Sequence, residues 1–214
     1  MNLQQFVKKL PKHLVYAPIY RKGVEIKSKD GKILKSTGKN PFGESYERQF
    51  SPDDVTYVLE KYPNRFGAVG LFTGIRGKGL VILDVDKNLA IHKKKWGDTL
   101  NGAPCITSTK KNAAKYIFKV PEELWSSVKG RMLSEQTSTC YEILFNKRQG
   151  LIFGAYPGST TSSEGNYGFE GDLDNIPTAP DWLLAEMKSL KANEGTAGFV
   201  KNRSGLVLSD RTED

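Results

Sequence analysis

The sequence has few of the residues from which disulfide-linked or metal-stapled folds are built. Its 214 residues include two cysteines, two histidines and three methionines. Cys105 and Cys140 cannot form a disulfide framework or a four-ligand zinc site. Residues 1–10 are typical of a short amphipathic helix rather than a signal peptide, so we expect reduced thiols and a cytoplasmic location. No apolar run approaches the ~20 residues of a membrane span. The composition therefore argues against secreted, membrane-spanning and zinc-finger proteins.

Positive charge dominates only part of the chain. The first 150 residues hold 27 Lys and Arg against 14 Asp and Glu, whereas the last 64 hold 5 against 10. A basic body with an acidic end suits a polyanionic partner, such as nucleic acid or the phosphates of a nucleotide. A solvated lysine-rich surface would give the same counts, so charge alone leaves both interpretations open.

Local patterns predict helices mixed with strands, and hence an α+β fold. Cap and spacing signals predict helices over 1–10, 52–62 and 88–96, from 121, and from 180 onward. Strand signals mark 67–73, 80–86, 115–120, 141–146 and 151–155, and we expect the last two to pair around a turn at 147–150. Residues 22–39 are typical of a hairpin or loop, with its turn at Asp30-Gly31. We expect one domain over 1–190, followed by a linker or tail over 191–214.

Two carboxylates end the most strand-like stretch of the chain, residues 80–86. Asp84 and Asp86 share one face, because side chains at positions i and i+2 of a strand point the same way. Unpaired carboxylates are costly to bury, so they need cations or basic partners. Hard oxygen ligands of this kind suit Mg²⁺ or Mn²⁺. The same pattern occurs at solvated strand ends, in glycosyltransferases and in aspartyl phosphatases, although the Gly-Thr expected of the phosphatases does not follow here.

Glu142 is a third candidate, because it interrupts the apolar run Tyr141-Glu142-Ile143-Leu144-Phe145. Taken alone, such an acid is typical of an outward-facing strand position. If its face joins that of Asp84 and Asp86, the three carboxylates could hold two divalent ions ~3.5–4 Å apart, as phosphoryl-transfer enzymes do.

The segment 107–115 combines small hydroxyls with three lysines in a loop that leads into a strand. Ser108, Lys110, Lys111 and Lys115, together with backbone N–H groups, could bind a triphosphate. A solvated hairpin turn would look the same. The segment has no Walker A pattern, which argues against a P-loop ATPase.

Several segments, taken in order, carry a resemblance to a known family. They are Lys39-Asn40-Pro41, 70–74, 79–86, 107–115, 141–144, 150–159 and 179–184. Their order and spacing resemble the bifunctional primase–polymerase (prim–pol) domain of the archaeo-eukaryotic primase superfamily, found in phage, plasmid and bacterial replication proteins. The resemblance covers roughly residues 10 to 190.

The resemblance implies an α+β, primase-like catalytic core with a mixed or antiparallel sheet and flanking helices. It implies a DNA primase or polymerase that carries out template-directed nucleotidyl transfer in DNA replication. The cofactors would be two Mg²⁺ or Mn²⁺ ions, held by Asp84, Asp86 and Glu142. The expected partners are single-stranded DNA, nucleoside triphosphates and a replicative helicase, fused or separate, in the cytoplasm of a bacterial host.

The resemblance also assigns nucleotide binding, with departures from the family pattern. Lys115 stands where the family's Ser-x-His motif places a histidine that contacts the nucleotide phosphates. Lysine supplies the positive charge with a different geometry. The family's Gly-rich turn is replaced by Thr107-Ser108-Thr109-Lys110-Lys111, and its Pro-Pro-Ser by Tyr156-Pro157-Gly158-Ser159. The implied nucleotide-binding residues are Ser108, Lys110, Lys111, Lys115 and Ser159, and Lys115 also joins the carboxylates as a catalytic residue.

Two other functions fit the same residues. A nucleic-acid-binding module could keep the fold without catalytic activity. The lysine at position 115, in place of the family's histidine, would then reflect that loss of activity. A metal-dependent nuclease or relaxase-like initiator could use the same acids for hydrolysis. A relaxase would need a tyrosine nucleophile and a histidine-rich metal site, and the two scattered histidines, His13 and His92, argue against it.

Overall fold

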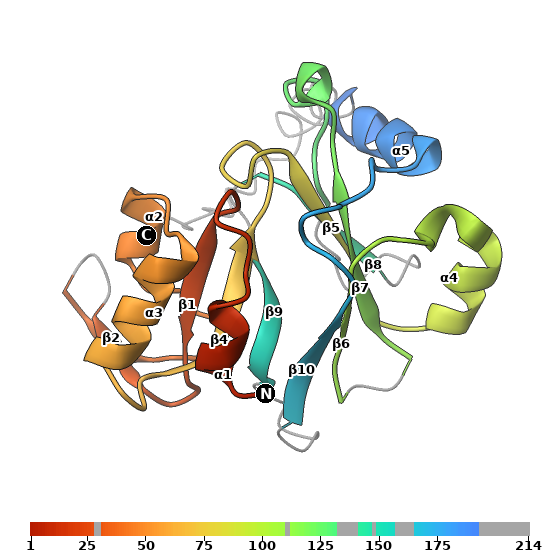
Figure 1. Ribbon diagram of the computed structural model, residues 1–214. Helices are drawn as coiled ribbons and strands as arrows, with labels where there is room; N and C mark the ends of the chain where they lie inside the picture. Colours follow the sequence, from red (N-terminus) through yellow and green to blue (C-terminus); the bar gives the residue numbers. More distant parts are fainter. Residues whose placement is uncertain (28–30, 110–111, 132–140, 147–148, 157–164, 193–214) are drawn as a thin grey trace, which may run out of the picture.

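The computed structural model describes residues 1–27, 31–109, 112–131, 141–146, 149–156 and 165–192. A sheet of eight strands forms its centre (Figure 1). In spatial order these strands are β1 (Tyr16–Tyr20), β4 (Phe66–Phe72), β9 (Gln149–Tyr156), β10 (Gly165–Glu170), β6 (Cys105–Thr107), β7 (Ala114–Lys119), β5 (Leu80–Val85) and β8 (Tyr141–Leu144). Every pairing in this sheet is antiparallel.

The remaining elements flank this sheet. The helices are α1 (Leu3–Val7), α2 (Glu44–Glu47), α3 (Pro52–Lys61), α4 (Leu89–Trp96) and α5 (Asp181–Ala192), with 3₁₀ turns at Gly97–Leu100 and Glu122–Leu124. In Figure 1, α1, α2 and α3 lie beside β1 and β4, whereas α4 and α5 lie beside the opposite half of the sheet. The short strands β2 (Glu25–Lys27) and β3 (Ile33–Lys35) form the separate hairpin predicted within 22–39. The α+β class predicted from the sequence is confirmed.

Strand β10 joins the two halves of the sheet. Its first three residues pair with β9, and its last three pair with β6. One half therefore contains β1, β4 and β9, and the other contains β6, β7, β5 and β8. The sheet curls between them, so that side chains of both halves, such as Ile117 of β7 and Leu71 of β4, pack in one apolar core.

Two apolar cores result from the alternation of side chains along the strands. On β5, Ile82 belongs to the core shared with α1, α3, β1 and β4. Val81, Leu83 and Val85 face the other way and pack in a second core with Leu183 and Met187 of α5. Strand β5 is thus buried on both faces, which explains its unbroken apolar run.

The helix α3 forms as its start signals predict. The Ser51 hydroxyl accepts a hydrogen bond from the Asp54 backbone N–H at 3.2 Å, and the Asp54 carboxylate accepts one from the Ser51 N–H at 2.9 Å. This capping box satisfies two otherwise unpaired donors. Pro52 occupies the first turn, where its missing N–H costs nothing. The helix buries Val55 and Val58 against the first core.

The expected pairing of 141–146 with 151–155 is wrong. Strand β8 pairs with β5, and β9 pairs with β4 and β10 on the far side of the sheet. In this register Leu151 and Ile152 of β9 are 6% and 0% exposed in the first core, and both edges of β9 are paired. A local hairpin would leave the edge of β4 without a partner, and unpaired edges are costly. The helix expected from Pro121 is a single 3₁₀ turn.

The turn before β5 needs glycine at a position of tight packing. Gly79 has φ +84°, and a Cβ built there would lie 2.5 Å from Trp125 Nε1. We expect Gly79→Ala to lower the free energy of unfolding by about 2–4 kcal/mol, because the left-handed backbone and the indole contact both oppose a methyl group. Chemical denaturation measures this loss.

Gly102→Ala is the matched control, because Gly102 has φ +76° with open space around its Cβ position. Here only the backbone conformation opposes the methyl group, at a cost of about 1 kcal/mol. Equal losses in the two variants would show that the Trp125 contact contributes nothing.

Candidate active site

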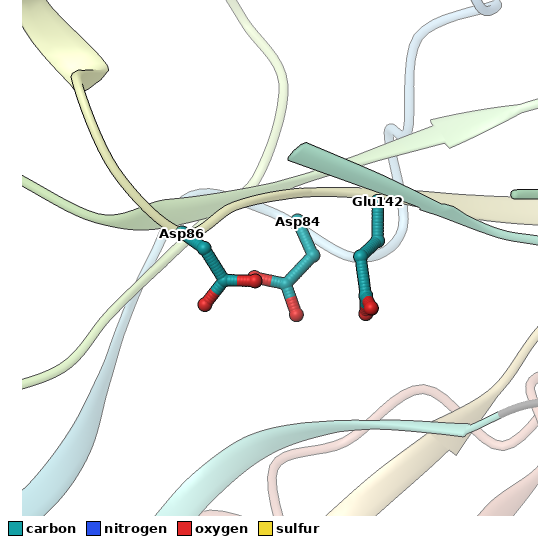
Figure 2. Close-up of side chains that lie close together, drawn as sticks. All are labelled: Asp84, Asp86 and Glu142. Carbon is teal, nitrogen blue, oxygen red and sulfur yellow. The ribbon is translucent and has the colours of Figure 1, made fainter. Parts of the chain in front are cut away.

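Three carboxylates meet at the end of β5 and on the neighbouring strand β8. Asp84 of β5 lies directly opposite Glu142 of β8 in the antiparallel register, and Asp86 follows two residues after Asp84. One carboxylate oxygen from each lies within 4.8 Å of the others. Figure 2 shows the three side chains extending to the same side of the sheet. In the structure, Glu142 therefore lies on the same face as Asp84 and Asp86. The sequence alone did not decide this point.

The carboxylates stand where their face of the sheet changes from apolar to polar. Ile82, two residues before Asp84, and Leu144, two residues after Glu142, lie on the same face and are paired with each other in the first core. All three acidic residues are half-buried. They are thus partly shielded from water and held by strands that are packed on the opposite face, which fixes their backbone positions.

Lys115 lies on the other side of Asp84 from Glu142. Strand β7 places Lys115 directly opposite Asp84. Its ammonium Nζ donates a hydrogen bond to Asp84 Oδ2. The two side chains are only 15% and 13% exposed, respectively. Burial of an ion pair is tolerable because each charge has its partner. A row of charges, Lys115–Asp84–Glu142, therefore crosses three adjacent strands.

A cavity of about 230 Å³ opens in front of these charges. Lys39 lines it as well, although no site role was predicted for this residue. The cavity is lined by Lys39, Asp84, Asp86, Ile106, Ser108, Ala113, Ala114, Lys115, Glu142 and Tyr167. With three acids and two lysines around it, the cavity can receive both cations and anions.

The loop that carries Lys39 is fixed by hydrogen bonds. The side-chain oxygen of Asn40 accepts bonds from the backbone N–H and the hydroxyl of Thr37, at 2.8 and 2.9 Å. Gly38 adopts φ +84° between them. The Gln149 side chain of β9 donates to the Lys39 carbonyl at 3.2 Å. The sequence signal that could have indicated this loop is Asn40, because asparagine side chains often close such turns.

The other predicted nucleotide-binding residues are only partly placed. Ser108 follows β6 and lines the cavity beside Lys115. Lys110, Lys111 and Ser159 lie outside the described residues. The structure thus brings together five of the residues singled out in the sequence, adding Ser108 and Lys115 to the carboxylates.

A second, larger cavity of about 730 Å³ lies next to the first. Tyr167 of β10 lines both cavities, and Gly38 lines the larger one next to Lys39 of the smaller. Arg21, Lys22 and Tyr20 contribute two positive charges and an aromatic ring. Arg21 is held in place by a hydrogen bond from its Nε to the Phe66 carbonyl at 3.0 Å. A basic, partly aromatic cavity therefore adjoins the acidic one.

The residues present fit divalent metal ions. Three half-buried carboxylates converge within 4.8 Å, and hard oxygen donors are the ligands that Mg²⁺ and Mn²⁺ prefer. Adjacent lysines suit the phosphates of a substrate. The fold and the site together define an α+β protein whose carboxylate centre is suited to divalent ions and phosphate-bearing ligands.

The chain belongs to the Prim-Pol family. The family model for the N-terminal domain of bifunctional DNA primase/polymerases matches residues 13–182. This stretch contains all the carboxylates of the site, together with Lys39 and Lys115. The resemblance identified from the sequence is confirmed. The family implies a nucleotidyltransferase-type enzyme of DNA replication that depends on divalent metal and has DNA and nucleotides as substrates.

A search of curated proteins finds no match to the chain. Among the described residues, none of the helices is long and apolar enough to cross a membrane.

Proposed function

We propose that this chain is a DNA primase/polymerase that joins nucleotides on a single-stranded DNA template by divalent-metal-dependent nucleotidyl transfer. The observation that carries the proposal is the convergence of Asp84, Asp86 and Glu142, within 4.8 Å of one another, in the lining of a cavity that also contains lysines. Residues 1–190 would form the catalytic unit. It would act in the cytoplasm of a bacterial host, with a replicative helicase as a partner.

The carboxylates of Asp84, Asp86 and Glu142 would hold two Mg²⁺ or Mn²⁺ ions. The chemistry that bound ions supply is activation of the primer 3′-hydroxyl for attack on the α-phosphate, and stabilisation of the departing pyrophosphate. The sheet fixes Asp84 and Glu142 on paired strands, and Asp86 follows the end of β5, so the three carboxylates already lie close together. Positioning and charge neutralisation account for most of the catalysis in such reactions.

Lys39, Ser108 and Lys115 would bind the triphosphate of the incoming nucleotide. All three line the acidic cavity, so phosphates bound by them would lie next to the carboxylates. Ammonium groups make strong, charge-assisted hydrogen bonds to phosphate oxygens. On the sequence alone, we assign Lys110, Lys111 and Ser159 to the same task.

The basic cavity around Arg21 and Lys22 would bind the template strand. A single strand there would pass Tyr167, which lines both cavities, and would bring a template base toward the nucleotide. A groove with cationic side chains and aromatic rings is the usual means of binding single-stranded DNA without sequence preference.

Incubation of the chain with single-stranded DNA, labelled nucleotides and Mg²⁺ or Mn²⁺ tests the proposal. We expect extended products that require the metal, and products formed without a primer would add primase activity. DNA binding without any product would favour the non-catalytic binding module. Shortened substrate DNA without synthesis would favour the nuclease. Running each reaction with EDTA gives the metal-free control.

A further inference from the structure

The contact between Lys115 and Asp84 places a cation of the chain itself on a candidate metal ligand. Lys115 Nζ hydrogen-bonds Asp84 Oδ2, and Asp84 is the middle member of the row that includes Glu142. The cross-strand register keeps the two backbones opposite each other, and both side chains are mostly shielded from water. The lysine thus neutralises one of the three carboxylates that meet at this site.

A carboxylate that already pairs with an ammonium group is a weak ligand for a second cation. Two positive charges on one carboxylate repel each other, and limited access of water leaves this repulsion poorly screened. Lys115 and a divalent ion therefore compete for Asp84. The ion gains its full set of ligands only when the ammonium group leaves.

The cavity offers Lys115 a place to go. Lys115 borders the space of about 230 Å³ that Lys39 and Ser108 also line. Its four-carbon stem turns easily, unlike the ring of a histidine, and its ammonium group can follow an anion over several ångströms. The phosphates of a nucleotide bound in this cavity would supply that anion.

We propose that Lys115 occupies Asp84 against divalent ions until a nucleoside triphosphate enters the cavity and takes the ammonium group onto its phosphates. The proposal rests on the proposed function for the identity of the anion. Lys115 then couples the two binding events, because its ammonium group moves from the carboxylate to the phosphates. By linkage, the nucleotide strengthens metal binding by the same factor by which the metal strengthens nucleotide binding. The free protein would bind metal weakly and would fill its site mainly when substrate is present.

Mn²⁺ binding to the full chain, followed by the electron paramagnetic resonance signal of the free ion, tests this competition. We expect Lys115→Met, which keeps the length of the side chain without its charge, to bind Mn²⁺ about tenfold more tightly than the wild type without nucleotide, within the usual range of site coupling. Lys119→Met is the matched control. Lys119 lies on the same strand and face but is exposed, and it does not line the cavity. It should match the wild type.

Addition of a non-hydrolysable triphosphate analogue tests the release step. We expect wild-type affinity for Mn²⁺ to rise toward that of Lys115→Met, so that the gap between the two proteins closes. Chelation of Mn²⁺ by the analogue itself affects both proteins equally and cancels in their ratio. Lys115→Gln should behave like Lys115→Met, and it replaces that variant if thermal melting shows a loss of folding.

Equal Mn²⁺ affinities of the wild type and Lys115→Met without nucleotide would overturn the competition. A gap that persists with the analogue would overturn the release step. Failure of the proposed function is distinguishable, because it is measured separately as the absence of DNA synthesis. A tenfold gap that closes with the analogue would support the coupling even in a protein that synthesises no DNA.

Discussion

Asp84→Asn is expected to reduce nucleotide incorporation by about three orders of magnitude or more. The substitution keeps the size of the side chain but removes the charge at the middle of the acidic row, between Lys115 and Glu142. Loss of this ligand weakens stabilisation of the charge that develops on the reacting phosphate in the transition state, so kcat should fall more than KM rises. The measurement is incorporation of labelled nucleotide on primed single-stranded DNA, with Mg²⁺ and with Mn²⁺.

Glu60→Gln provides the control for loss of one carboxylate charge. Glu60 is exposed on α3 and does not line the acidic cavity. Its removal should leave incorporation unchanged. Because Asp84→Asn also removes the partner of Lys115, its melting temperature is measured beside its activity. A folded Asp84→Asn variant that retained wild-type synthesis would remove Asp84 from the catalytic centre.

The pair Asp84 and Asp86 was predictable from the sequence because its geometry is local. Alternation along a single strand puts positions i and i+2 on one face, whatever the rest of the fold does. The same holds for α3, whose start is set by Ser51 and Asp54 within one turn. These two local features therefore carried over into the structure, whereas the helix expected from Pro121 shortened to a single 3₁₀ turn.

The position of Glu142 was left open by the sequence because it depends on the register between distant strands. Nothing in the segment 141–146 indicates that β8 pairs with β5 instead of β9. That choice is made by the whole sheet, in which β9 is paired on both edges. The expected hairpin was wrong for the same reason, since a short connection favours local pairing only when both strands lack better partners.

The site role of Lys39 and the strand β10 were harder still to predict, because both depend on segments that are distant in the sequence. Lys39 reaches the acidic cavity from a loop before α2, far from the carboxylates in the chain. Strand β10 contains two glycines and little apolar sequence, yet it joins both halves of the sheet and provides Tyr167. Its strand character comes from its two neighbours and not from its own propensity.

The two halves of the sheet would have different tasks in the proposed reaction, because the acidic row and the basic cavity lie on different halves. The half with β5, β7 and β8 carries the acidic row. The basic cavity is lined mainly from β1, β4 and β9 and from the residues after β1, including Arg21 and Lys22. A strand of DNA held on one half would thus meet a nucleotide held on the other, with Tyr167 between them.

The double variant Arg21→Gln/Lys22→Gln is therefore expected to weaken binding of single-stranded DNA by about 10- to 100-fold at low salt, because two charge-assisted contacts to phosphate are lost. The slope of log affinity against log salt concentration should become shallower by about 1.4, since each phosphate contact on a single strand contributes ~0.7. Fluorescence anisotropy of a labelled oligonucleotide over a series of salt concentrations measures both quantities.

The matched control is Lys188→Gln/Lys191→Gln, which removes the same charge from α5 (Figure 1), away from the basic cavity. If general attraction to the net positive charge of +8 accounts for DNA binding, both double variants lose affinity equally. If the template lies in the cavity, only Arg21→Gln/Lys22→Gln shows the large loss and the shallower slope. Its effect should also appear in the KM for DNA and not in the KM for nucleotide, because the lysines beside the carboxylates are intact.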